Sequence, residues 1–131
     1  MRGILLLALS IILSLGSSSC ITDLGDETFL IRVDSVMSAP TARLGDVMVF
    51  RLAGFVGPDG RYSFWRIEEM RTDRGAEITV WGRKRGTDTY TAEAKYLEGL
   101  QFETKATRPG EFILAIRQPG GSRLLDTVLV Q

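Results

Sequence analysis

The stretch that decides the fold is VMVFRLAGFVGPDGRYSFWRIEEM, residues 47–70. Its first part, Val47–Phe55, predicts a long and mostly apolar strand with Arg51 facing away from the core. Residues 57–60, Gly-Pro-Asp-Gly, predict a turn, because proline presets one φ angle and glycine tolerates a positive one. Tyr62–Arg71 then predicts the next strand. The side chains that share the inner face of the first strand are Met48, Phe50 and Leu52.

The same pattern continues on both sides of this stretch. No segment after Cys20 shows sustained helical periodicity, and short apolar alternations separated by turn residues recur instead. An edge strand is expected near Thr89–Ala94. The chain therefore predicts an all-β domain, a sandwich or barrel of seven to eight antiparallel strands. The other expected strands are residues 29–33, 76–83, 100–106, 112–117 and 123–130.

Two features within this pattern resemble an immunoglobulin-like β-sandwich. Trp65 lies in the third expected strand, and Pro109-Gly110-Glu111-Phe112 leads into the sixth. The segment is similar to the Pro-Gly-x-Tyr entry of many such domains, although Phe112 replaces the tyrosine and no disulfide is available. The resemblance implies a core position for Trp65. It implies no particular activity, because such folds carry many unrelated functions.

Composition restricts the chemistry that the chain can perform. The 131 residues include 16 Lys and Arg, 16 Asp and Glu, no His and one Cys. A zero net charge gives no reason to expect nucleic acid as a partner. The absence of His excludes catalytic triads that contain His, general bases that use imidazole, and metal sites with His ligands. We therefore expect a protein that is not an enzyme and that uses neither a cofactor nor a metal.

The N-terminus carries a targeting signal. Arg2 precedes an apolar run, Ile4–Leu15, that is shorter than a membrane-spanning helix requires. Gly and three Ser residues follow at 16–19, directly before Cys20, the one cysteine of the chain. This arrangement resembles the signal of bacterial lipoproteins, in which the cysteine is lipidated and becomes the new N-terminus. Ser17 stands where most members carry an aliphatic residue.

The resemblance implies three parts of the chain. Residues 1–19 are a cleaved signal helix, residues 20–28 are the lipidated cysteine with a flexible acidic tether, and residues 29–131 are the immunoglobulin-like sandwich. It also implies a bacterial protein held in the membrane of the cell envelope by palmitate or a similar acyl chain, on the periplasmic side or at the surface. The alternative is an ordinary secretory signal cut near Ser19, which leaves Cys20 as a free thiol.

Candidate binding residues come from the aromatic positions. Trp81 has the opposite parity from Ile78 and Val80, so we expect it on the outer face beside Arg83, where a Trp can stack on a sugar or anchor an interface. Phe55 and Val56 precede the Gly-Pro-Asp-Gly turn and can form an apolar tip.

These residues lead to one expected function and two alternatives. We expect a membrane-anchored envelope lipoprotein with a binding or structural role, whose partner is an envelope protein or a glycan. One alternative is a protease inhibitor that acts through sandwich-end loops at Phe55–Gly60. The other is a carbohydrate-binding module that uses Trp81.

Overall fold

The computed structural model describes residues 25–131, so the predicted signal helix, Cys20 and residues 21–24 of the tether lie outside the described residues. The described chain is all β. The longer strands coincide with stretches of alternating or β-branched and aromatic residues, as expected for half-buried strands. The nine strands are β1 (Glu27–Leu30), β2 (Ser35–Met37), β3 (Thr41–Ala42), β4 (Val47–Gly57), β5 (Tyr62–Thr72), β6 (Gly75–Lys84), β7 (Lys95–Lys105), β8 (Gly110–Arg117) and β9 (Arg123–Val130).

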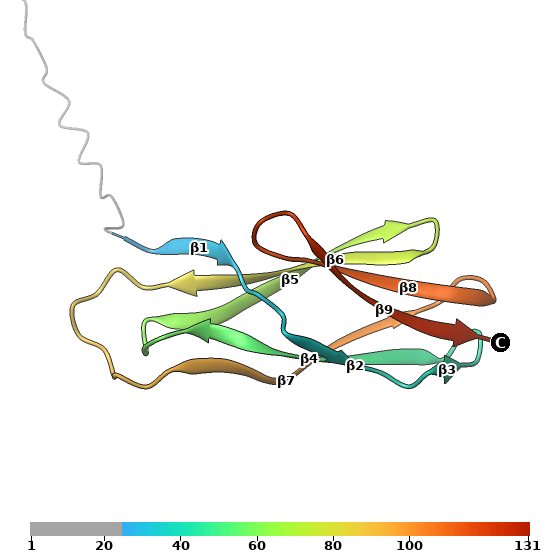
Figure 1. Ribbon diagram of the computed structural model, residues 1–131, viewed down its shortest axis with the longest axis horizontal. Helices are drawn as coiled ribbons and strands as arrows, with labels where there is room; N and C mark the ends of the chain where they lie inside the picture. The colour runs from blue at the N-terminus through green and yellow to red at the C-terminus, as the bar shows by residue number, and fades with distance from the viewer. Residues whose placement is uncertain (1–24) are drawn as a thin grey trace, which may run out of the picture.

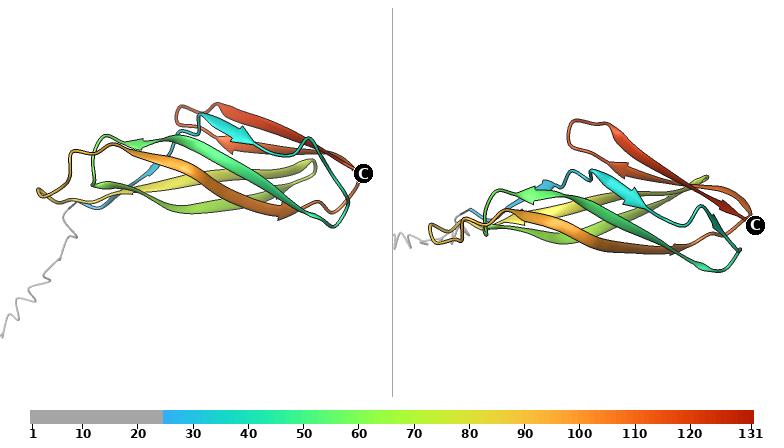
Figure 2. Two further views of the ribbon diagram at one scale, coloured as in Figure 1. Left: turned by 90° about the horizontal axis from the view of Figure 1, so that it is seen from below. Right: turned by 60° about the horizontal axis from the view of Figure 1, so that its bottom comes forward.

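The strands form two sheets that pack face to face (Figure 1). The larger sheet has six strands: β6 pairs with β5, β1 and β8, and β8 continues through β9 to β3. The smaller sheet has the order β2-β4-β7. The prediction of an all-β sandwich is therefore confirmed. Seen from two further sides, β1 lies toward one end of the molecule, and β3 lies at the other end beside the C-terminus (Figure 2).

The pairing is not antiparallel throughout, which corrects the sequence prediction. β6 pairs with β8 in parallel, and β3 pairs with β9 in parallel. The first parallel pair arises because β7 belongs to the smaller sheet, so the chain reverses twice between β6 and β8 and returns in its original direction. Gly75 permits the close approach, because a Cβ at this position would collide with the backbone of Ile113.

One edge of β6 serves two strands. β1 pairs with Trp81–Lys84, and β8 pairs with Gly75–Ile78 on the same side. Between them, the Ile31 N–H donates to the Val80 carbonyl at 2.8 Å. The chain then leaves the larger sheet and joins the smaller one as β2.

The Gln118 side chain closes this junction. Its Nε2 donates to the Val33 carbonyl at 2.8 Å, and its Oε1 accepts from the Val33 N–H at 3.0 Å. The amide therefore substitutes for a strand partner at the point where the backbone of Val33 leaves β6. Without it, two partly buried backbone groups would lose their partners, which costs free energy.

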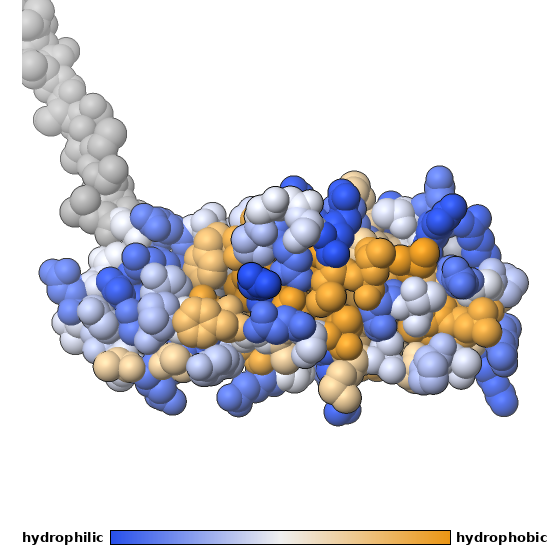
Figure 3. Space-filling model, viewed as in Figure 1, coloured by the Kyte–Doolittle hydropathy of each residue, from blue (hydrophilic) through white to orange (hydrophobic). Residues whose placement is uncertain are grey.

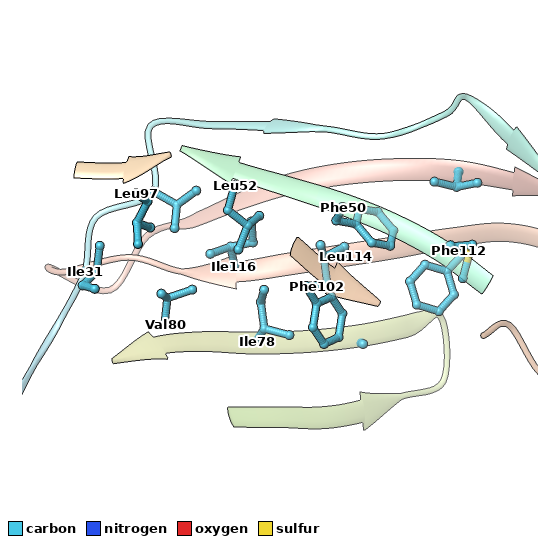
Figure 4. Packing of buried hydrophobic residues seen from close by; sticks show 14 of the residues in the cluster. Ile31, Phe50, Leu52, Ile78, Val80, Leu97, Phe102, Phe112, Leu114 and Ile116 are labelled. Carbon is cyan, nitrogen blue, oxygen red and sulfur yellow. The ribbon is translucent and has the colours of Figure 1, made fainter. Parts of the chain in front are cut away.

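The core fills the space between the sheets (Figure 4). The predicted inner face of β4 is confirmed: Met48 is 4% exposed, and Phe50 and Leu52 are fully buried. The Phe50 ring packs against Phe102 of β7 at 6.2 Å and against Phe112 of β8 at 6.1 Å between centroids. Opposite β4, the larger sheet contributes Ala76, Ile78, Val80, Leu114 and Ile116.

The prediction that Trp65 belongs to the core is wrong. The register between β5 and β6 shifts between Phe64 and Arg66, which leaves Trp65 without a directly opposed residue. Such a bulge changes the side to which a side chain points. Trp65 is 40% exposed, whereas Ile67 packs against the core.

Two further expectations also need correction. Thr89–Ala94 forms no strand, and residues 85–94 are irregular. β1 begins at Glu27, so residues 27 and 28, expected in the tether, are paired with β6. A strand is favoured there because the exposed edge of β6 beyond β8 supplies unpaired backbone groups.

Two leucines on adjacent strands test the inner and outer faces. Leu114 of β8 is fully buried, so Leu114→Ala should lower the free energy of unfolding by about 2–5 kcal/mol. Leu125 of β9 is 60% exposed, so Leu125→Ala should change it by less than about 0.5 kcal/mol. Urea denaturation followed by circular dichroism measures both. Equal losses in the two variants would contradict this assignment of faces.

Candidate functional site

The residues proposed from the sequence as a binding surface do not come together. Trp81 and Arg83 lie on the outer face of the larger sheet, as expected, but Trp81 is half-buried. Phe55 is 44% exposed on the outer face of the smaller sheet, where its ring meets Tyr96 edge to face at 5.6 Å. Val56 is only 6% exposed and belongs to the core. Trp81 and Phe55 therefore occupy opposite faces of the sandwich, at the end where β4 finishes, and Val56 lies between the sheets.

The outer face of the larger sheet carries an aromatic and cationic cluster. The guanidinium carbons of Arg66 and Arg83 lie 4.4 and 5.3 Å from the ring centroid of Trp65. Trp81 is the strand partner of Arg66, and its Nε1 is buried without a hydrogen-bond partner among the described residues. Arginine side chains thus already pack against the ring of Trp65, so a sugar could stack on this ring only by displacing them. The sequence analysis did not place Trp65 in this cluster, because the bulge in β5 cannot be recognised from the alternation of apolar and polar residues.

The turn at the same end is held firmly in place. Arg61 donates through Nε to Asp59 Oδ1 at 2.9 Å and through Nη2 to Oδ2 at 2.7 Å, and its backbone N–H also donates to Oδ1 at 3.0 Å. The Gly60 N–H donates to the Thr91 carbonyl at 2.8 Å. Tyr90 lies under the Arg61 guanidinium, 4.2 Å from its centre. The turn is therefore packed against the 85–94 segment.

The Asp59–Arg61 pair has a clear electrostatic consequence. The hydrogen bonds from the Arg61 side chain lower the pKa of the Asp59 carboxyl below its ordinary value of 3.8. The same bonds raise the pKa of Arg61, so both groups are charged at neutral pH. A bidentate pair of this kind fixes geometry as well as charge.

A groove lies at the other end of the sandwich, beside β3. It has a volume of about 530 Å³, within the range of ligand-binding pockets. The β2–β3 segment forms one wall and the first half of β4 the other. Figure 3 shows hydrophobic residues along the middle of the face that carries β2, continuing toward the β3 end. The residues that line the groove include Met37, Ala42, Val47, Met48, Arg51 and Val128.

Sequence reasoning missed this groove. The strands beside it have three residues in β2 and two in β3, which is too short for any periodicity to show. The sequence shows only that apolar residues such as Met37 and Val47 lie on both sides of Pro40, and the structure shows that both are exposed. Met37 is 70% exposed, and Val47 is 49% exposed.

Comparisons with known proteins give no family. A scan against protein-family models found no match, and searches of curated proteins and of solved structures found no significant match. Within residues 25–131, no helix is long and apolar enough to cross a membrane. The same part of the chain holds no group of three or more acidic, Cys or His residues placed to bind a metal ion.

The Asp59–Arg61 pair predicts a pH-dependent stability. Because the pKa of Asp59 is lowered on folding, its contribution is present above pH 3.8 and is lost as the pH falls through the lowered pKa. Asp59→Asn should therefore lower the melting temperature at pH 7 by roughly 5 °C. The difference from wild type should begin to shrink as the pH falls below 3.8 and should vanish below the lowered pKa. Thermal unfolding at several pH values measures this effect.

The exposed Asp88 provides the matched control, and Asp88→Asn should leave the melting temperature unchanged within about 1 °C at every pH. A difference between wild type and Asp59→Asn that persists undiminished at pH 3 would argue against the ion pair as its cause.

Proposed function

We propose that this chain is a lipid-anchored lipoprotein of the bacterial cell envelope, with a binding or structural role and no chemistry of its own. The observation that carries the proposal is that the first strand of the domain and its groove lie at opposite ends of the sandwich. β1 begins at Glu27, seven residues after Cys20, and lies at one end of the sandwich. The groove beside β3 lies at the other end. A domain tethered through Cys20 would hold this groove away from the membrane.

The chemistry of the N-terminus supports the anchor. Cys20 is the one cysteine in the chain, and four serine or glycine residues precede it, which suits a peptidase that needs an unhindered backbone. A single unpaired cysteine in an exported protein needs a role, and lipidation supplies one. Each buried methylene contributes about 0.8 kcal/mol, so several acyl chains would give a stable anchor.

The immunoglobulin-like class is a finer part of this proposal. Its support is the packing of two sheets and the central place of β4 in the smaller one. The order in the larger sheet departs from that class. In immunoglobulin domains the third strand, C, lies directly beside the sixth, F. If β4 is taken as the second strand, B, the matching strands are β5 and β8. Here β6 lies between β5 and β8.

The two alternative functions find less support in the geometry. A glycan platform on Trp81 would use a half-buried ring, and its neighbour Trp65 is already covered by arginine. An inhibitory tip at residues 55–60 would use a turn in which Val56 and Asp59 are both buried. Both functions stay predictions.

Labelled palmitate tests the anchor. In a bacterial host the wild-type chain should incorporate the label and fractionate with membranes, and Cys20→Ala should reduce both to background. Because the chain has no second cysteine, no other thiol can take the label. Ser17→Leu provides the matched control, since it supplies the aliphatic residue usual at that position and should keep or increase incorporation. Export of unlabelled, soluble wild-type protein would overturn the proposal.

A further inference from the structure

We propose that the groove at the β3 end binds an extended peptide segment of another protein, which adds a strand to the open edge of β4. This inference deepens the proposed function: it rests on the binding role but does not require the lipid anchor.

The first argument is the unpaired edge. β2 pairs with Arg51–Ala53 of β4, and no other strand within residues 25–131 pairs with Val47–Phe50 on that side. The opposite side of the same residues is fully paired with Phe102–Lys105 of β7. An open strand edge presents backbone donors and acceptors in a fixed row, which an extended peptide satisfies. The chemistry of the edge therefore selects a strand.

The second argument is direction and length. β2 runs antiparallel to β4, but after Met37 the chain turns away toward β3 in the other sheet. A peptide in the groove would continue the path of β2 along the four residues Val47–Phe50, about 13 Å of edge. Arg51 would then lie near its N-terminal end and Asp46 near its C-terminal end. This charge arrangement favours an acidic residue first and a basic residue last.

The third argument is the lining. Side chains of a bound strand alternate between two faces. One set would point toward Met48 and Val128, two core residues that form the floor of the groove. The other set would lie beside the exposed Met37 and Val47. The groove thus fits a segment with apolar residues at alternating positions.

The chain's own N-terminus does not suit this place after processing at Cys20. Residues 20–24 would then precede Gly25, and five extended residues span at most about 18 Å. The 11 residues of β4 extend over about 36 Å and separate the β1 end from the β3 end. A segment of another protein is therefore the better occupant.

The experiment uses the full chain, with and without Cys20→Ser, in detergent micelles. The probe is a fluorescent peptide, acetyl-Glu-Val-Thr-Val-Thr-Lys-amide, and the comparison is the same peptide with alternate backbone nitrogens methylated. We expect binding of the first peptide and at least about tenfold weaker binding of the second, because methylation removes donors and keeps the side chains. If the Cys20→Ser variant binds the peptide as well as the wild type does, peptide binding does not depend on the lipid anchor, and the two proposals can fail separately.

Two methionines provide matched variants. Met37 lines the groove and is 70% exposed, whereas Met70 is 60% exposed on the outer face of the larger sheet. Met37→Glu should weaken peptide binding about tenfold, and Met70→Glu should leave it within about twofold. Hydrogen exchange should show new protection at amides within Val47–Phe50 when the peptide binds.

Three results would overturn the proposal. The first is equal binding of the methylated peptide. The second is an equal effect of the two methionine variants. The third is protection of the Val47–Phe50 amides that rises with protein concentration in the absence of peptide, which would show that a second copy of the chain covers the edge.

Discussion

The structure depends on the sharing of one edge of β6 by two strands. β8 occupies Gly75–Ile78, so only Trp81–Lys84 is left for β1, and the first segment must leave the larger sheet near Ile31. The backbone groups exposed at this departure cannot stay unpaired at a partly buried position. The Gln118 amide satisfies both groups of Val33, which makes the departure of the chain compatible with a closed core.

The groove is a consequence of the same constraint. After leaving β6, the segment crosses to β4 for the three residues of β2 and then returns to β9 for the two residues of β3. It is too short to cover the whole of β4 while it also reaches β9. Within the described residues, the edge at Val47–Phe50 therefore has no strand partner, and core residues such as Met48 and Val128 form the floor of the groove.

Features set by local periodicity were predictable, and features set by register or by the partner sheet were not. The alternation of β4 gave the buried Met48, Phe50 and Leu52 correctly, because a regular stretch of strand places side chains by parity alone. The prediction for Trp65 was wrong because a single bulge reverses the side to which the following side chains point and leaves no mark in the sequence. The parallel pairing of β6 with β8 could not be predicted, because it depends on β7 joining the smaller sheet. One wall of the groove is the β2–β3 segment, whose two strands are too short to show a pattern.

The two ends of the sandwich differ in how their polar groups are satisfied, and this difference bears on function. At the β1 end, Asp59 and Arg61 bond to each other, and Gly60 bonds to Thr91, so the turn offers little free hydrogen-bonding capacity. At the β3 end, one edge of β4 at Val47–Phe50 has no strand partner within residues 25–131, and exposed apolar side chains lie beside it. A row of such groups gains most from a partner that supplies both backbone bonds and apolar contact. If Cys20 holds the β1 end at the membrane, the end with unmet bonding capacity is the one that faces outward.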